Sequence, residues 1–447
     1  MKPSILKGTR DFLPVQVAKR NYIFSTIKNV FELYGYEAIE TPVMEKLSTL
    51  TGKYGEEGDK LIFKVLNNGD YLSKADAAAL AEKNSSKLTS SISKRGLRYD
   101  LTVPFARFVT MHQNDITFPF KRYQIQQVWR GDKPQRGRYQ EFYQCDADIV
   151  GSGSLMYEAE LVKIYDSVFA SLNINVCIKV NNRKVLFGLA ESAGIADKFM
   201  EMTMAIDKID KIGPEGVLRE MSKRGISDEQ AQKVLNNLKI DNLDTLEKAF
   251  ENSPEGLKGV EELRKFHSFL DTTKTTNEIK FDLSLARGLT YYTGCIFEVQ
   301  SKDVKIGSIG GGGRYDDLTS SFGLKGVSGV GISFGAARIY DVMEELDLFP
   351  ASVNENLKVL FMAFDDSSHI YAFQCLSEIR LKGISADLYP APVKLKKQMK
   401  YANDKNIPYV ILIGSEELES KILTLKEMNS GEQHKLNLDQ IITKLSE

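Results

Sequence analysis

The side chains best suited to chemistry are concentrated in the stretch WRGDKPQRGRYQEFYQCDAD, residues 129–148. Its first ten residues hold four cations and one carboxylate, namely Arg130, Lys133, Arg136, Arg138 and Asp132. Guanidinium groups bind phosphate oxygens through paired N–H donors, so this set suits a polyphosphate. A solvated run of surface charges is the competing interpretation, and the run taken by itself favours it.

The second half of this stretch has the pattern of a β-strand. Alternation would place Phe142, Gln144, Asp146 and Asp148 together on one face. A solvated sheet face would explain the polar residues, but it would leave the Phe142 ring in water. The pattern therefore favours a concave polar site with one aromatic ring available for stacking.

A second candidate is the segment SLARGLTYYTG, residues 284–294. Arg287 stands there among small and apolar residues, with Tyr291 and Tyr292 just downstream on an expected strand. A buried arginine needs an anionic partner. A ligand phosphate and a structural carboxylate both remain open, and the carboxylate is the commoner partner.

Two glycine-rich segments are ambiguous. The run Gly310–Gly313 is equally compatible with a flexible loop and with a backbone that lets a planar or phosphorylated ligand approach closely. No GxxxxGK[ST] phosphate loop is present, so a nucleotide bound here would use another mode. The weaker pattern GKYGEEG, residues 52–58, favours a mobile loop.

The histidines and cysteines give no metal-binding pattern. His112, His267, His369 and His434 are neither clustered nor in HExxH spacing, and we interpret them as structural or surface residues. The four cysteines lie far apart without a CxxC pair, which argues against disulfides and a zinc site and favours a reducing cytoplasm. No metal site formed by the protein alone is predicted.

The bulk properties are those of a multidomain protein without a global affinity for polyanions. The chain has 447 residues and a formal net charge of -1, so a nucleic acid would have to be met by local clusters of Lys and Arg. Neither a signal peptide nor a run of about 18 apolar residues occurs, so neither secretion nor a membrane span is predicted.

The elements that must position these residues follow from periodicity. Helical spacing over residues 15–34 ends at Gly35 before a strand-like segment, and residues 119–150 have the pattern of a long antiparallel hairpin. Lys/Glu/Leu-rich helical sequence then separates two groups of strands, and a final region alternates short buried strands with helices. The expected divisions are a core in two parts (1–185 and 276–350), a helical insertion (186–275), a linker (351–356) and a C-terminal α/β domain (357–447).

Taken together, the motifs resemble those of the histidyl-tRNA synthetase family, a class II aminoacyl-tRNA synthetase family. The resemblance spans almost the whole chain, through KGTRDFLP, YEAIETPVME, RYDLTVPFAR, WRGDKPQRGRYQEFYQCDADIVG, SLARGLTYYTG, GGGGRYDDL and GVSGVGISFGAARI. It implies an α+β fold with a six-stranded antiparallel catalytic sheet, a helical insertion that contacts the tRNA acceptor stem, and a C-terminal anticodon-binding domain. It also implies a homodimer formed partly through YEAIETPVME.

The resemblance further implies roles for individual residues. Arg130 would bind the ATP α-phosphate and the histidine carboxylate, Arg138 and Arg338 the γ-phosphate end, Phe142 the adenine ring, and Gln135 the acceptor end of the tRNA. The implied histidine pocket comprises Asp100, Leu101, Thr102, Arg130, Gln144, Asp148, Arg287, Tyr291, Tyr292, Gly310, Gly311 and Gly312. Within it, Asp100, Thr102 and Gln144 would hold the α-amino group. Asp148 and Tyr292, beside Tyr291, would recognise the imidazole.

The implied reaction needs no nucleophilic side chain. The histidine carboxylate attacks the α-phosphorus of Mg²⁺-ATP to give histidyl-adenylate and pyrophosphate, and the 3′ end of the tRNA then accepts histidine. Two alternatives remain: a regulatory paralogue without catalysis, and a class II synthetase for another amino acid. The phosphate-binding arginines and the C-terminal domain argue against the first, and Asp148, Tyr292 and SLARGL argue against the second.

Overall fold

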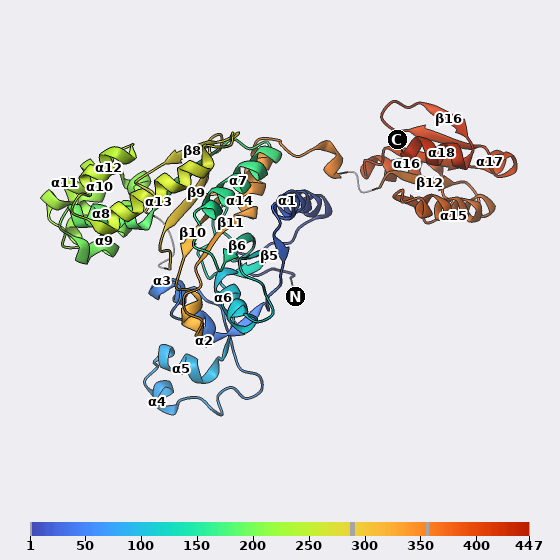
Figure 1. The fold of residues 1–447 in the computed structure, drawn as a ribbon. Helices are drawn as coiled ribbons and strands as arrows, with labels where there is room; N and C mark the ends of the chain where they lie inside the picture. Colours follow the sequence, from blue (N-terminus) through green and yellow to red (C-terminus); the bar gives the residue numbers. More distant parts are fainter. Residues whose placement is uncertain (1, 287–290, 355–356, 447) are drawn as a thin grey trace. The chain divides into compact units, whose positions relative to one another are not determined.

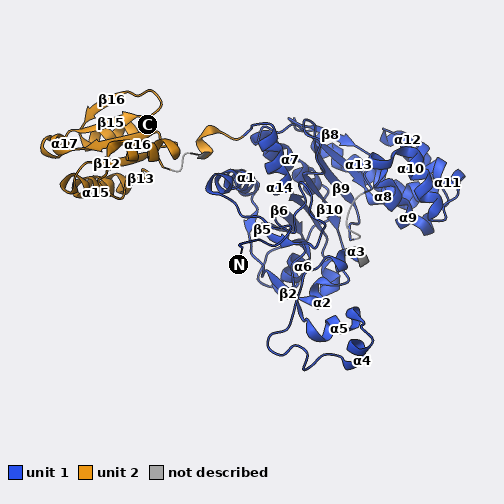
Figure 2. Ribbon diagram, turned by 180° about the vertical axis from the view of Figure 1, so that it is seen from behind, with its two compact units in different colours: residues 1–348 blue, residues 349–447 orange. Residues whose placement is uncertain are grey.

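The computed structural model describes residues 2–286, 291–354 and 357–446. The described chain forms two compact units, residues 1–348 and 349–447, which are coloured separately in Figure 2. The predicted α+β class, with a separate C-terminal domain, is confirmed. No helix among the described residues is long and apolar enough to cross a membrane.

The first unit is built on a sheet whose six central strands are antiparallel, as expected. In spatial order the described strands are β1 (Glu37–Ala38), β5 (Phe120–Trp129), β6 (Glu141–Val150), β11 (Gly329–Phe334), β10 (Gly310–Tyr315), β9 (Cys295–Ser301), β7 (Val176–Asn182) and β8 (Glu278–Phe281). The short edge strands β1 and β8 pair in parallel and extend the expected sheet to eight strands.

The hairpin predicted over residues 119–150 is confirmed by the pairing of β5 with β6. The register runs from Phe120 opposite Val150 to Trp129 opposite Glu141, and residues 130–140 form the tip. The predicted first helix is also confirmed as α1 (Pro14–Leu33). It buries Ile23, Ile27, Val30 and Phe31 and is followed by Gly35 at a φ of 76°.

Three helices cover one face of this sheet (Figure 1): α1, α7 (Met156–Ser171) and α14 (Ala336–Glu345). Phe334 of β11 is central to this contact, because its ring lies 4.8 Å from Tyr165 of α7 and 5.8 Å from Phe31 of α1. Burying the apolar residues on this side leaves the polar strand residues on the opposite face.

The structure decides the run Gly310–Gly313, for which a loop was one of two open interpretations, and the loop predicted for residues 52–58 was wrong. The run Gly310–Gly313 forms most of β10 and pairs with strands on both sides, because ladder hydrogen bonds from two neighbours outweigh the low strand propensity of glycine. In residues 52–58, Gly55 begins the short helix α3 (Gly55–Lys60). The buried side chain of Tyr54 anchors this segment, and the Gly52 N–H donates to Asp59 Oδ2 at 2.7 Å.

The chain between the two groups of strands is helical from Arg183 to Leu270. Its helices are α8 (Arg183–Ser192), α9 (Phe199–Ile206), α10 (Ile209–Lys223), α11 (Asp228–Asn237), α12 (Leu243–Ala249) and α13 (Pro254–Leu270). Near the hairpin, a small sheet of β2 (Met44–Lys46), β4 (Arg95–Leu97) and β3 (Lys64–Val65) precedes α6 (Thr102–Met111), with α2 (Leu47–Leu50), α4 (Ala77–Ala81) and α5 (Ser85–Ile92) beside it in the sequence.

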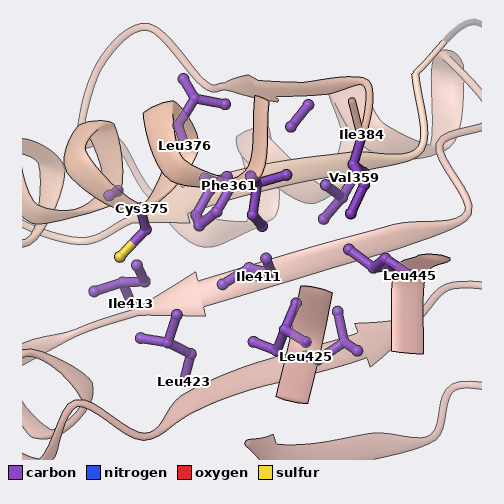
Figure 3. Close-up of a cluster of buried hydrophobic side chains, with 14 of the residues drawn as sticks. Val359, Phe361, Cys375, Leu376, Ile384, Ile411, Ile413, Leu423, Leu425 and Leu445 are labelled. Carbon is purple, nitrogen blue, oxygen red and sulfur yellow. The ribbon is translucent and has the colours of Figure 1, made fainter. Parts of the chain in front are cut away.

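The second unit contains a mixed five-stranded sheet. Its strands β13 (Ala386–Leu388), β12 (Val359–Ala363) and β14 (Tyr409–Ile413) are parallel, as predicted. The antiparallel strands β15 (Leu423–Glu427) and β16 (Gln433–Leu436) were not predicted. Figure 3 shows Phe361, Ile411 and Leu425 in the core between this sheet and helices α15 (Asp366–Leu381) and α18 (Leu438–Ser446). The remaining helices are α16 (Leu395–Asp404) and α17 (Ser415–Ser420).

A buried ion pair joins the sheet of the first unit to α7. Arg314 of β10 contacts both carboxylate oxygens of Glu158, with its Nη2 2.7 Å from Oε2, and both side chains are buried. Burial raises the pKa of Glu158, and the Arg314 guanidinium opposes that rise. Arg314 is therefore the counter-charge of a carboxyl group within the core.

Replacing only one member of this pair should be costly. We expect Arg314→Met to lose about 3–5 kcal/mol of stability, because Glu158 would remain buried without its counter-charge. The loss should be larger at pH 8 than at pH 5. A carboxyl group whose pKa is higher in the folded than in the unfolded state stabilises the folded state at low pH. That contribution to stability is lost as the pH rises through the folded-state pKa. Urea denaturation of the full chain at both pH values measures this.

The double variant Arg314→Met/Glu158→Leu is the matched control. It should recover much of the lost stability, since no unpaired charge remains buried. A single variant as stable as the double variant at pH 8 would contradict the assignment.

Candidate active site

The polar face of the sheet is organised in rows that cross several strands. Residues directly opposite each other on paired strands share a face. One row therefore contains Gln124, Asp146, Ser333, Gly311 and Glu298. The next row contains Arg122, Asp148, Gly331, Gly313 and Ile296. Acidic residues of β6 thus lie beside a floor of glycines on β10 and β11.

The glycines of β10 divide between the two faces. Gly311 and Gly313 share the polar face, whereas a Cβ on Gly310 would lie 2.7 Å from the Tyr165 ring of α7, on the helix-covered face. Gly312 alternates with Gly311, and a Cβ there would lie 2.1 Å from the Gly331 carbonyl oxygen. Of the three glycines expected in the pocket, only Gly311 would direct a side chain toward the polar face. Gly313 lies on the same face but was not predicted.

Asp148 is buried and already has protein partners. The Tyr315 hydroxyl donates to its Oδ1 at 2.6 Å, and Arg122 Nη2 lies 2.7 Å from its Oδ2. The second contact is a charge contact without hydrogen-bond alignment, so Oδ2 has no hydrogen-bond partner among the described residues. Burial raises the pKa of Asp148, while Arg122 lowers it.

Sequence reasoning missed the three residues that hold Asp148 in place. Arg122 is fully buried, and its guanidinium lies 4.2 Å from the centre of the Phe105 ring. Gly331 leaves the space that the carboxylate occupies, because a Cβ there would lie 1.9 Å from Asp148 Oδ1. The available signal was strand parity, which places Arg122 with Gln124 and Gln126 on one face of β5.

Asp100 and Thr102 lie at the start of α6. Asp100 Oδ1 accepts from the Tyr54 hydroxyl at 2.8 Å and from the Val103 N–H at 3.1 Å. Its Oδ2 is buried and has no hydrogen-bond partner among the described residues. Burial raises the pKa of Asp100. Leu101, between Asp100 and Thr102, is fully buried.

Tyr291 and Tyr292 lie in the segment before β9, which begins at Cys295, so their placement on a strand was wrong. The Tyr291 hydroxyl is hydrogen-bonded to the Thr102 side chain. Burial raises the pKa of Tyr292, and so do the negative charges of Asp148, Asp146 and Asp100. Tyr292 therefore lies close to three carboxyl groups from two parts of the chain.

Arg130 connects the acidic strand to the aromatic residues. Its Nε donates to the Tyr99 carbonyl at 3.0 Å and its Nη2 donates to Gln144 Oε1 at 3.1 Å. The guanidinium carbon lies 4.4 Å from the Tyr99 ring centre and 5.1 Å from that of Phe142. The structure thus brings together Arg130, Phe142 and Gln144, as strand parity predicted for the last two.

Of the other expected cations, Arg138 lies at the hairpin tip and Arg338 contacts the tip from α14. Arg138 pairs with Asp132 at 2.8 Å, and Arg338 of α14 donates to the carbonyl oxygens of Gly137 and Ser308 at 2.9 and 2.6 Å. Gln135 is exposed on the same tip. Arg287 lies outside the described residues.

This arrangement has a cationic, aromatic end and an acidic end joined through Arg130 and Gln144. The first suits an anionic ligand with a planar ring. The second suits a ligand with a cationic group. Among the residues that the structure describes, no group of three His, Cys, Asp or Glu side chains is placed to hold a metal ion.

The chain is similar to known proteins over its whole length. The family model described as histidyl-tRNA synthetase matches residues 8–75 and 69–339, and the model described as anticodon binding domain matches residues 352–447. A histidine–tRNA ligase of Bacteroides fragilis is 54% identical over 100% of this chain and 99% of its own length. One of Christiangramia forsetii is 56% identical over 98% of both chains.

Solved structures give the same result. The crystal structure of histidyl-tRNA synthetase from Nostoc sp. PCC 7120 matches with a TM-score of 0.84 and 30% identity, covering 100% of this chain and 99% of the other. The apo histidyl-tRNA synthetase of S. aureus matches in fold, with a TM-score of 0.70 and 21% identity over both full chains.

The close approach of Gly331 to Asp148 gives a direct test of the site geometry. We expect Gly331→Ala to lose about 1–3 kcal/mol of stability, because the new methyl group must displace the buried carboxylate or bend β11. Differential scanning fluorimetry of the full chain measures the effect as a lower melting temperature.

Gly311→Ala is the matched control on the neighbouring strand. A Cβ there would meet only the Phe297 carbonyl oxygen, at 3.4 Å, so this variant should melt close to the wild type. Equal melting temperatures for the two variants would show that Asp148 does not occupy the space beside Gly331.

Proposed function

The chain belongs to the histidyl-tRNA synthetase family, and from this premise we propose how its residues ligate histidine to tRNA. It is a class II aminoacyl-tRNA synthetase that charges tRNA with histidine. The observation that carries the proposal is the contact of Arg130 with Gln144, which joins the aromatic and acidic ends of one polar sheet face.

We assign the aromatic end to ATP. Phe142 stacks on adenine, and Arg130 meets the α-phosphate together with the histidine carboxylate. Arg338 and Arg138 receive the γ-phosphate end, and Mg²⁺ enters as part of the Mg²⁺-ATP substrate. Arg130 is well suited to its role, because in the described part of the chain it donates hydrogen bonds only to uncharged acceptors and forms no ion pair, while its charge opposes the rise in the pKa of Asp100.

We assign the acidic end to histidine. The α-ammonium group lies against Asp100 Oδ2, which is buried without a hydrogen-bond partner among the described residues, and Thr102 and Gln144 complete its surroundings. Asp148 accepts an imidazole N–H, with Tyr292 and Tyr291 beside the ring and Gly311 beneath it. Arg122 and Tyr315 hold the Asp148 carboxylate in one orientation before histidine arrives.

Activation then depends on position and charge. The histidine carboxylate oxygen forms a bond to the α-phosphorus as the bond to pyrophosphate breaks, and cations stabilise the charge that develops. Arg287 is proposed as a further α-phosphate contact on the strength of SLARGL alone. In the second step, the 3′-hydroxyl of the tRNA attacks the adenylate carbonyl and AMP leaves.

The tRNA and a second copy of the chain complete the proposal. Gln135 contacts the acceptor end, the helices between Arg183 and Leu270 meet the acceptor stem, and the C-terminal unit binds the anticodon. The homodimer forms partly through residues 36–45, where Val43 and Met44 are 42% and 48% exposed. We place the activity in the cytoplasm, where charged tRNA enters translation.

A regulatory paralogue is the other candidate. Its solved counterpart, titled an ATP phosphoribosyltransferase regulatory subunit/histidyl-tRNA synthetase, shares the fold at 19% identity. The identity above 50% to ligases over the full chain favours the enzyme. Pyrophosphate exchange tested with each amino acid decides, since a regulatory subunit would give none and another synthetase would respond to a different amino acid.

Specificity should depend on Asp148. We expect Asp148→Ala and the closer isostere Asp148→Asn to weaken histidine binding by roughly 10- to 150-fold, the value of a charged hydrogen bond of about 1.5–3 kcal/mol, and to change ATP binding little. Equilibrium dialysis with each ligand measures both constants. Melting temperatures provide the control, because either variant leaves Arg122 buried without its counter-charge. Equal weakening of both ligands would contradict the role.

The C-terminal unit should be separable from activation. We expect a dimeric chain ending at Asn356 to retain histidine-dependent pyrophosphate exchange but to lose most tRNA charging. Its tRNA affinity should also depend less steeply on salt, since fewer phosphates would be contacted. Exchange, charging and filter binding at several salt concentrations test this. Normal charging by the shortened chain would remove the anticodon-binding role.

A further inference from the structure

Asp146 is a buried carboxyl group in the middle of the pocket, and the reaction described above does not use it. It lies on β6 between Gln144 and Asp148, on the same face as both. Its cross-strand neighbours are Gln124 on β5 and Ser333 on β11. A carboxyl group at such a position must be neutral or compensated.

The hydrogen bonds of Asp146 lead directly to Arg130. Gln144 Nε2 donates to Asp146 Oδ1 at 3.4 Å. The same Nε2 donates to Ser333 Oγ at 3.0 Å, which leaves Gln144 Oε1 to accept from Arg130 at 3.1 Å. Asp146 and Ser333 therefore fix which end of the Gln144 amide faces Arg130.

Among the residues that the structure describes, carboxyl groups outnumber cations around Asp146. It faces the cation Arg122 on β5 and the carboxyl groups of Asp148 on its own strand and Asp100 before α6. The neutral titratable groups nearby are Tyr165 of α7, Tyr292 before β9 and Cys145. Among the described residues, three carboxyl groups thus share the guanidinium groups of Arg122 and Arg130, and Arg130 acts on Asp100. Burial raises the pKa of Asp146 to about 7, with Arg122 opposing the rise.

We propose that Asp146 is a proton-linked positioning residue of the histidine pocket: it carries a proton while the pocket is empty and releases that proton when the α-ammonium group of histidine enters. The inference rests on the proposed function. The ammonium group enters against Asp100 and Gln144, beside Asp146, whereas the histidine carboxylate lies at Arg130. The nearer positive charge stabilises the ionised form of Asp146, and the proton passes to solvent. The ionised carboxylate then accepts from Gln144 and holds its Oε1 toward Arg130.

Proton release on binding is the measurement that tests the proposal. Isothermal titration of histidine into the full-length enzyme, in buffers of different ionisation enthalpy, counts the protons. By linkage from a pKa near 7, Asp146 should release about 0.5 proton at pH 7, roughly 0.9 at pH 6 and roughly 0.1 at pH 8. These amounts are the expected differences in the number of protons released by the wild type and by Asp146→Asn. The titration of the ligand's own imidazole contributes to both proteins and cancels.

Affinity gives a second readout with a defined sign. Below pH 7 the wild type must expel a proton to bind histidine, so its affinity should fall relative to that of Asp146→Asn as the pH is lowered, by up to tenfold per unit. If Asp146 had a merely structural role, the ratio of the two histidine affinities would not change with pH. Asp166→Asn, at a buried carboxylate of α7 that hydrogen-bonds to Thr276 and Asn277, is the matched control and should release as many protons as the wild type.

Two further measurements keep the proposal falsifiable if Asp146→Asn folds poorly. The infrared difference spectrum of the wild type at pH 6 should lose a protonated-carboxyl band when histidine binds, and the absence of that loss would overturn the inference. Deamino-histidine, 3-(imidazol-4-yl)propionate, lacks the ammonium group and should release no Asp146 proton. Equal release by this analogue would also overturn it.

Failure of the inference differs from failure of the proposed function. Histidine binding with equal proton release by the wild type and Asp146→Asn would remove the proton link alone. An absence of both histidine binding and histidine-dependent pyrophosphate exchange in the wild type would remove the assigned pocket, and the inference with it.

Discussion

A carboxylate withdrawn from water must be matched by charge or hydrogen bonds, and β6 carries Asp146 and Asp148 on one buried face. Much of the first unit follows from this requirement. The neighbouring strand β5 supplies Arg122, the strand β10 supplies the Tyr315 hydroxyl, and β11 supplies Gly331, whose missing side chain leaves room for Asp148. The apolar side chains of these strands occupy the opposite face, where α1, α7 and α14 cover them.

The sequence predicted the polar face of β6 but not the residues on other strands that contact it. Strand parity is a local property, so the grouping of Gln144, Asp146 and Asp148 could be predicted from one segment. The pairing of Asp148 with Arg122 depends on the register of two strands, and the pairing with Tyr315 joins residues far apart in the chain. No spacing within a single segment contains that information.

The open interpretation of the glycine run and the failure to predict the C-terminal strands have the same origin. Gly310–Gly313 has low intrinsic strand propensity, and the neighbours that make it a strand, β9 and β11, are contributed by other segments. β15 and β16 are short, and three of the four residues of β16 are polar, so alternation gave little signal there. The long helices and the hairpin were predicted because their periodic patterns extend over ten residues or more.

Burial decides which cations of the site remain available to substrates. The Arg122 side chain is 0% exposed against Asp148, so separating that pair would leave a charge buried, and Arg122 serves the protein alone. The Arg138 side chain is 49% exposed while its partner Asp132 is only 9% exposed, so a triphosphate can reach the Arg138 guanidinium from the solvent side without separating it from that carboxylate. Arg130 stands between these cases: it is partly buried and donates to the Tyr99 carbonyl and Gln144 Oε1, which fix its position without neutralising it. An uncompensated charge held in place is what stabilises a developing negative charge without reorganisation, and the described site provides it where its acidic and aromatic ends meet.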